Sequence, residues 1–203
     1  MEPYSDSLFA LPPLSPTAKK AGRKKGKGSL ILPHSYVIID IETTGLYPAR
    51  DAIIEIGAIL VQGSSAVREF QTFLQPEPYR RLTPFITNLT GIRNEDLAQA
   101  PRFADILPEF RSFIGGYTLA GHNVNFDIDF LYDRIYQITG EHLDNPWLDT
   151  RRLAKTVLPG LPHYSLEFLC QYFGIEGNHH RAVDDCRLTK EVLEKLYAIS
   201  SRS

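Results

Sequence analysis

The stretch "YVIIDIET", Tyr36–Thr43, decides the fold. Its continuous run of β-branched residues is typical of a central strand buried on both faces. Side chains alternate along a strand, so Asp40 and Glu42 share one face, with their Cα atoms ~7 Å apart. Two carboxylates there lose hydration and repel each other, and a hard divalent cation would compensate both effects. Taken alone, however, a D-x-E pair is more often a strand end whose acids simply point into water.

Two further strands are expected directly after this one, "AIIEIGAILVQ" and "AVREFQTFLQ", and the short "GSS" link between them favours a hairpin. A helical region follows, then a short strand "YTLAGH", a helix ended by Gly140, and a fifth strand in "PWLDT". Three last helices are expected at 150–157, 165–173 and about 181–198. An antiparallel trio followed by β-α-β units predicts an α/β domain with a five-stranded mixed sheet and helices on its faces.

The chain divides into a basic segment, 1–34, predicted to be a disordered tail or linker, and one folded domain, 35–203. Residues 1–30 hold six of the 22 Lys and Arg and two of the 24 acids, which leaves 16 basic and 22 acidic residues for the remainder. A tail of +4 therefore precedes a body of −6. The acidic body fits a site that collects cations.

Location is predicted from what the sequence lacks. No apolar run approaches the ~20 residues of a membrane span, and the first residues make a poor signal peptide. The two cysteines, Cys170 and Cys186, lie in apolar helix-like stretches and are expected to be free buried thiols. We expect a cytoplasmic protein that makes no membrane contact.

A second polar stretch is "GHNVNFDIDFL", Gly121–Leu131, in which His122 and Asn123 follow a strand. Asp127 falls in the first turn of the next helix, where the helix dipole favours a carboxylate. Taken alone, Asp127 could be an ordinary acid of a helix start. His122 lies beside the expected site and is interpreted mainly as support.

The third polar stretch, "GNHHRAVDDCRLT" at Gly177–Thr189, pairs two histidines with two aspartates. The pattern is helical from residue 181, so Asp184 and Asp185 point ~100° apart and only one can reach a given site. The sequence spacing alone leaves open which aspartate and which histidine take part.

Together, "DIETTGL", "GHNVNFDIDFL" and "HHRAVDD" resemble the three motifs of the DnaQ-like 3′–5′ exonucleases, in the branch with three Asp, one Glu and one His. The resemblance runs from about residue 36 to residue 196 and implies the ribonuclease H-like fold. It is similar in detail to the proofreading exonuclease domain, or epsilon subunit, of bacterial DNA polymerase III. The family's H-x-A-x-x-D motif selects His180 and Asp185, which leaves His179 as a surface-loop residue and Asp184 as a helix-start charge.

The resemblance implies a two-metal phosphodiester hydrolase with two Mg²⁺ or Mn²⁺ ions. The implied metal ligands are Asp40, Glu42, Asp127 and Asp185, and the implied general base is His180, since histidine exchanges protons near neutral pH. Thr43 and Leu46 would receive the terminal nucleotide, with His122 and Asn123 also assigned to the substrate side. The implied products are nucleoside 5′-monophosphates.

The sequence leaves the substrate and the biological role of such an exonuclease open. The leading interpretation is an exonuclease on single-stranded DNA 3′ ends, with proofreading as one role and a DNA polymerase or another nucleic-acid-processing complex as a partner of the tail. An exoribonuclease that trims RNA 3′ ends and a trimmer of DNA ends in CRISPR spacer acquisition are alternatives. A catalytically silent binding module is the competing non-enzyme reading.

Overall fold

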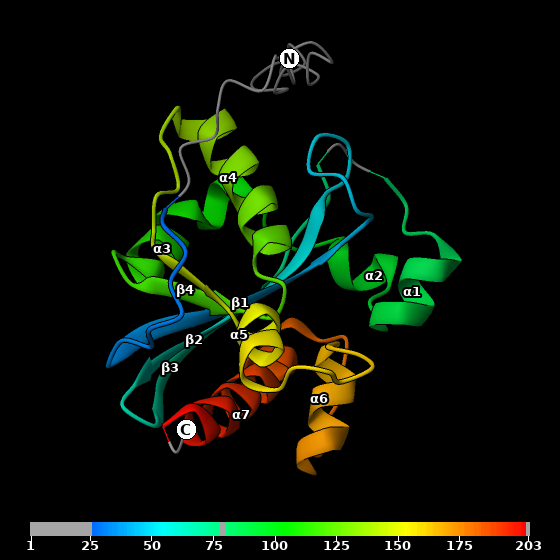
Figure 1. Ribbon diagram of the computed structural model, residues 1–203. Coiled ribbons are helices and arrows are strands. Elements are labelled where there is room, and N and C mark those ends of the chain that lie inside the picture. Colours follow the sequence, from blue (N-terminus) through cyan, green and yellow to red (C-terminus); the bar gives the residue numbers. More distant parts are fainter. Residues whose placement is uncertain (1–25, 78–79, 202–203) are drawn as a thin grey trace, which may run out of the picture.

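The fold is a five-stranded mixed sheet between layers of helices, as seen in a computed structural model that describes residues 26–77 and 80–201 (Figure 1). The strand order is β3-β2-β1-β4-β5. β1, β2 and β3 are antiparallel, whereas β4 runs parallel to β1 and β5 parallel to β4, so the predicted sheet is confirmed. The strands are β1 Ser35–Thr43, β2 Ile53–Gln62, β3 Ser65–Phe73, β4 Thr118–Gly121 and β5 Trp147–Asp149.

The helices divide between the two sides of the sheet. α3 and α4 cover one face, α5, α6 and α7 lie on the other, and α1 and α2 stand at one side (Figure 1). Their bounds are α1 Pro84–Thr90, α2 Asn94–Leu97, α3 Phe103–Ile114, α4 Asn125–Thr139, α5 Thr150–Val157, α6 Leu166–Phe173 and α7 Ala182–Ser200. α4 ends at Gly140, which adopts the left-handed conformation that glycine tolerates best.

The central strand β1 feeds both cores, because its side chains alternate. Val37, Ile39 and Ile41 pack against α3 and α4, whereas Tyr36 and Ile38 pack against α5, α6 and α7. The next residues on the second face are Asp40 and Glu42. The α7 side of the sheet is therefore apolar at the start of β1 and acidic at its end.

The prediction that residues 1–34 form a tail is wrong for residues 26–34, while 1–25 lie outside the described residues. Gly28 bridges to Trp147 of β5, and the indole Nε1 of Trp147 donates to the Gly26 carbonyl at 2.9 Å. A Cβ on Gly28 would lie 2.7 Å from the Trp147 ring, so glycine permits this approach. Leu30 and Leu32 then join the core on the α7 side.

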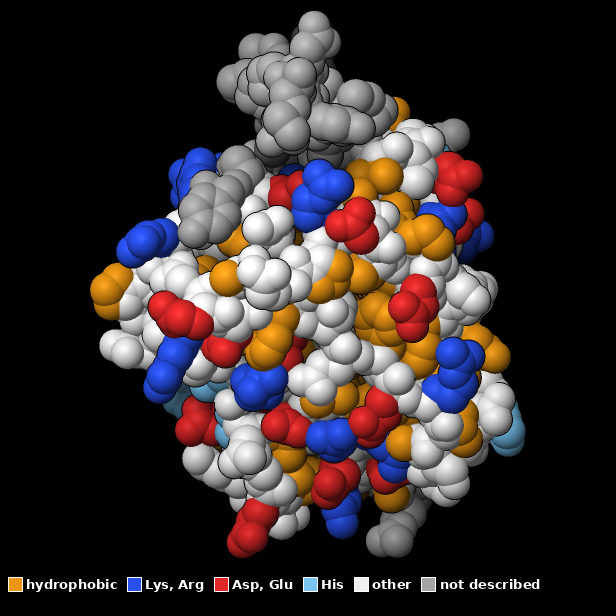
Figure 2. Space-filling model, turned by 180° about the vertical axis from the view of Figure 1, so that it is seen from behind, with side chains coloured by type: hydrophobic (Ala, Val, Ile, Leu, Met, Phe, Trp, Pro, Cys, Tyr) orange, Lys and Arg blue, Asp and Glu red, His pale blue; other side chains and the backbone are white. Residues whose placement is uncertain are grey.

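The distribution of charged and cysteine side chains fits a charged surface around a core with free thiols. On the face opposite to that of Figure 1, acidic and basic side chains alternate over the lower half (Figure 2). Cys170 and Cys186 are both buried and free, as predicted. Within 26–77 and 80–201, no helix has the length and apolar character to cross a membrane.

Candidate active site

The site begins where β1 turns acidic. Asp40 stands opposite Gly57 of β2, and Glu42 stands opposite Glu55, before a register shift between Glu42 and Thr43 ends the regular pairing. Gly57 has no side chain, and a Cβ there would lie 2.4 Å from the backbone of Ala182. The start of α7 therefore lies directly against the sheet, next to the two β1 carboxylates.

Asp127 enters from the first turn of α4 and is 3% exposed. Its Oδ1 accepts a 3.0 Å hydrogen bond from the backbone N–H of Ile41, the residue between Asp40 and Glu42. This bond ties the start of α4 to the end of β1. Asp127 is therefore held beside the β1 carboxylates and does not point into solvent as an ordinary helix-start acid would.

α7 supplies the fourth carboxylate. Asp185 is 8% exposed and accepts hydrogen bonds from the backbone N–H of His180 at 2.9 Å and from Nδ1 of His179 at 3.2 Å. Asp184 points elsewhere and pairs with Arg187 at 2.6 Å. The structure thus brings Asp185 into the cluster and leaves Asp184 out, as the helix geometry requires.

The two histidines hold different positions. His180 is exposed and adopts φ 66°, a left-handed backbone that side chains rarely take. Ligand atoms of His180, Glu42 and Asp185 lie within 4.8 Å of one another. His179 lies in the loop before α7, as predicted, but it is half-buried and contacts the site carboxylate of Asp185, so it is not a purely surface residue.

The electrostatics of the cluster favour a cation. Burial raises the pKa of Asp40 well above its usual value, and the neighbouring Asp127, Asp185 and Glu42 raise it further. Burial, then Asp185 and Glu55, raise the pKa of Glu42 to about 8. Burial also raises the pKa values of Asp127 and Asp185. Four carboxylates that ionise so reluctantly are an oxygen donor set suited to hard divalent ions such as Mg²⁺ or Mn²⁺.

A cavity of about 230 Å³ opens over this cluster. Asp40 lines it from β1, Asp185 from α7, and His179 and His180 from the loop before α7. The remaining lining residues are His122, Ser165, Leu166 and Glu167. The space is open to solvent, so a group larger than this volume can extend out of it.

His122 is a supporting residue in this structure. Its ring nitrogens lie 2.9 Å from Thr150 Oγ1 and 2.9 Å from the Tyr164 carbonyl, so both are engaged by the protein. Burial lowers the pKa of His122 to about 4, which keeps the ring neutral near pH 7. The ring fixes the start of α5 to the loop before α6, and its nitrogens are not available to the substrate.

Three other predicted substrate residues surround the end of β1. Thr43 is buried and donates its hydroxyl to the Gly45 carbonyl at 2.6 Å, whereas Leu46 is 73% exposed. Asn123 is exposed, adopts φ 63°, and donates its backbone N–H to Asp149 at 3.2 Å. Of these three residues, Leu46 alone offers a large apolar side chain to an incoming base.

Glu55 is the residue that sequence reasoning missed. It is fully buried in β2 and accepts from the Arg181 guanidinium at 3.0 Å and from the backbone N–H of Ala182 at 3.3 Å. Gln71 of β3 donates to it at 2.8 Å. A carboxylate inside the apolar run "IIEIGAI" was the available signal, because such a charge needs a partner. The pair with Glu55 therefore fixes the position of Arg181, which links the two histidines to the start of α7.

Removing the Glu55 charge is expected to destabilise the protein. In Glu55→Gln the bonds to Arg181 weaken inside a buried site, so we expect the free energy of unfolding to fall by about 2 kcal/mol in urea denaturation. The control is Glu69→Gln on β3, which breaks an exposed pair with Arg187. That variant should lose less than about 1 kcal/mol. Equal losses in both variants would show that Glu55 has no special structural role.

Comparison with known proteins agrees with this geometry. The family model described as Exonuclease matches residues 37–193. The DNA polymerase III subunit epsilon of Aquifex aeolicus is 36% identical over 167 residues, which cover 82% of this chain and 82% of that protein. The PolC-type DNA polymerase III of Caldanaerobacter subterraneus subsp. tengcongensis is 37% identical over 183 residues, 88% of this chain. This match spans only 13% of that much longer relative.

Solved structures give the same fold. A structure described as Exonuclease X in complex with 5′ overhanging duplex DNA superposes with a TM-score of 0.66 at 25% identity, over 82% of this chain and 93% of the other. Escherichia coli Exonuclease I in complex with a dT13 oligonucleotide gives a TM-score of 0.71 at 22% identity, over 84% and 42%. The chain belongs to the exonuclease family, and the predicted family and ribonuclease H-like fold are both confirmed.

Proposed function

We propose that this protein is a metal-dependent 3′–5′ exonuclease that releases nucleoside 5′-monophosphates from the 3′ ends of single-stranded DNA. The observation that carries the proposal is the convergence of four carboxylates from β1, α4 and α7 beside an exposed histidine. Membership of the exonuclease family supports the reaction class.

The carboxylates and the histidine have different proposed roles, which follow from their positions. Asp40, Glu42, Asp127 and Asp185 would hold two Mg²⁺ or Mn²⁺ ions, which when bound supply Lewis-acid activation of water and stabilise the charge on the leaving oxygen. His180 accepts the proton of the attacking water, and its exposed loop position gives it access to the cavity. The hydrogen bonds to Asp185 from the His179–His180 segment hold that carboxylate in place.

The substrate end is expected at the carboxyl end of β1. Leu46 is well placed to pack against the terminal base, because it is more exposed than Tyr47, the other exposed large hydrophobic residue of the loop after β1. Backbone near Thr43 would contact the terminal 3′ hydroxyl. His122 contributes by fixing the cavity wall rather than by touching the strand.

DNA is proposed as the substrate because the two polymerase relatives are both DNA polymerase III proteins. Proofreading with a polymerase, contacted through the N-terminal segment, is the corresponding biological role. RNA is the second candidate, since a 3′-exonuclease bound to a histone mRNA stem-loop shares the fold with a TM-score of 0.70 at 19% identity. Trimming of DNA ends in CRISPR spacer acquisition is a third use of the same chemistry. The ratio of kcat/KM on matched DNA and RNA strands separates the first two.

Cleavage is expected to stop when divalent metal is removed. A strand labelled at its 5′ end should give a ladder that shortens from the 3′ end with Mg²⁺, and no products in excess EDTA, because bound cations would supply the activation of water and the stabilisation of charge that the four carboxylates cannot supply alone. A denaturing gel with DNA and RNA side by side measures both points. Undiminished hydrolysis in EDTA, or a first product cut from the 5′ end, would contradict the proposed function.

A further inference from the structure

A basic face on α5 stands beside the acidic site. Arg151, Arg152 and Lys155 are exposed on this eight-residue helix, whereas Leu153 and Ala154 are buried. At ~100° per residue, the three basic positions fall within ~100° of one another around the helix axis. No acidic residue occurs in the helix, so one side of α5 presents positive charge alone.

Part of the positive charge of the body is already neutralised by acidic partners, but the charge of these three side chains is not. Arg102, Arg111 and Arg187 each form an ion pair with an acidic residue at 3.4 Å or less. For Arg151, Arg152 and Lys155, no carboxylate of residues 26–77 and 80–201 lies within ion-pair distance. Unpaired positive charge on an otherwise acidic body is available to an external anion.

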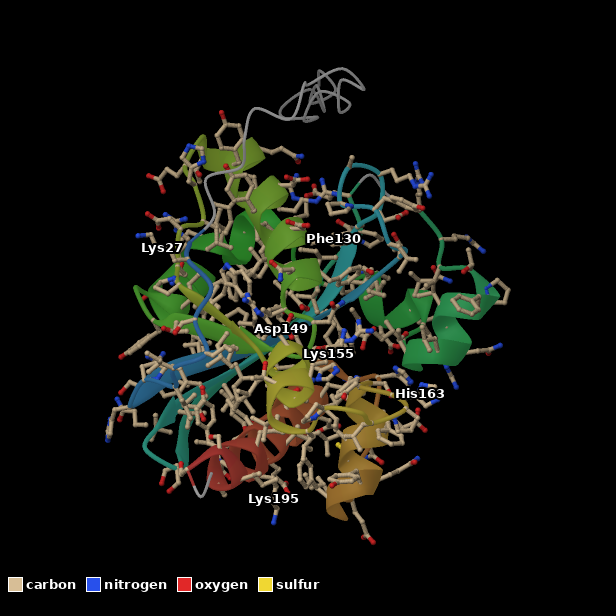
Figure 3. The ribbon with its side chains drawn as sticks, viewed as in Figure 1. Lys27, Phe130, Asp149, Lys155, His163 and Lys195 are labelled. Atoms are coloured by element: carbon tan, nitrogen blue, oxygen red, sulfur yellow. The ribbon has the colours of Figure 1, made fainter. Side chains whose placement is uncertain are left out.

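The basic face adjoins the cavity through His122. This ring contacts Thr150, the first residue of α5, and the Tyr164 carbonyl in the loop that follows α5, and it also lines the cavity with Asp40. The ammonium of Lys155 lies 5.8 Å from the centre of the Tyr164 ring. Figure 3 shows Lys155 between Asp149 at the start of α5 and the loop with His163, whereas Lys195 lies at the bottom of the view, on α7.

We propose that the α5 face formed by Arg151, Arg152 and Lys155 binds the phosphodiester backbone of the substrate strand, on the 5′ side of the scissile phosphate. This inference rests on the proposed function, because it takes the 3′-terminal nucleotide to occupy the cavity. A strand that enters an acidic site must overcome repulsion of its other phosphates, and cations along its path compensate for this. The contacts are to phosphates, so the face adds affinity without sequence preference.

The test combines binding and kinetics in the full-length chain. The variant R151Q/R152Q/K155Q is compared with the parent on a single strand of ~12 nucleotides, long enough to extend beyond the cavity. Three lost phosphate contacts should reduce the log–log salt slope of binding by about 2, measured by fluorescence anisotropy with Mg²⁺ in a His180→Ala background that cleaves slowly. In the background with His180 intact, KM should rise roughly tenfold while kcat stays unchanged.

Two controls separate binding from damage. Lys195→Gln removes one exposed charge from α7 and should leave the slope unchanged, whereas Lys155→Gln should lower it by about 0.7. A p-nitrophenyl ester of thymidine monophosphate has no strand beyond the site, so the triple variant should hydrolyse it like the parent. An unchanged slope, or an equal loss on the small ester, would overturn the proposal. If the parent cleaves neither substrate, the proposed function fails, and the anisotropy slopes still decide whether the α5 face binds a strand.

Discussion

Asp40→Asn is expected to lower kcat/KM by about 10³-fold or more while the protein remains folded. The other three carboxylates, Asp127, Asp185 and Glu42, all interact electrostatically with Asp40, which makes Asp40 the centre of the cluster. Its loss should therefore remove several kcal/mol of transition-state stabilisation, at ~1.4 kcal/mol for each tenfold in rate. Single-turnover hydrolysis of a labelled strand gives the rate. Circular dichroism and thermal melting show whether the fold survives.

The same substitution is expected to raise the melting temperature of the metal-free protein at pH 8. A carboxyl whose pKa is raised on folding stabilises the protein at low pH and loses this contribution as pH rises through the folded pKa. For Glu42 the window runs from 4.5 to about 8, and the pKa of Asp40 is raised as well. The metal-free parent should therefore lose melting temperature across this window, and Mg²⁺ or Mn²⁺ should restore it.

Asp184→Asn is the matched control for Asp40→Asn, because Asp184 is an acid of α7 that points away from the cluster and pairs with Arg187. It should leave the rate within about tenfold of the parent and should not reduce the metal-dependent rise in melting temperature. If the metal-free parent instead gained stability with rising pH, the carboxylates would not be the repulsive cluster described here.

His180→Ala should lower kcat by ~10²–10⁴-fold, the usual cost of losing a general base. The metal-dependent shift in melting temperature should remain close to that of the parent, because the four carboxylates are intact. His179→Ala should behave differently. Its ring nitrogen contacts Asp185, so its loss should raise the metal concentration needed for half-maximal activity ~10-fold and leave turnover at saturating metal nearly unchanged.

The two histidine variants should therefore differ in kind: His180→Ala changes the turnover rate, and His179→Ala changes the metal concentration needed for half-maximal activity. Metal titration of initial rates at fixed substrate measures both quantities. Asp185→Asn should combine both effects. A dead His179→Ala beside an active His180→Ala would show that the motif is assigned one residue out of register.

The sequence predicted local structure and side-chain direction correctly where a single strand or helix periodicity was clear. The run at Tyr36–Thr43 predicted both the central strand and the shared face of Asp40 and Glu42, because the pleat leaves no other arrangement. Helical spacing likewise separated Asp184 from Asp185. The family motif then placed Asp127 in the same cluster, which spacing alone could not do across the 84 residues between Glu42 and Asp127.

Long-range partners were outside the reach of such reasoning. Glu55 meets Arg181 only because Gly57 allows α7 to approach β2 closely, and no local pattern links positions so far apart. The contact of His179 with Asp185 depends on the unusual backbone of His180. The boundary at residue 34 was set by composition, and composition does not report the docking of Leu30 and Leu32 on the core.

The docking of residues 26–32 has a consequence for any shortened form of the chain. Trp147 exchanges backbone hydrogen bonds with this segment, donating to the Lys27 carbonyl and accepting from the N–H of Ser29. A protein begun at Ser35 would leave these groups of β5 unpaired and uncover the indole, which creates an open strand edge prone to pairing with another copy. Such a fragment should self-associate, whereas one begun at Gly26 keeps the edge closed.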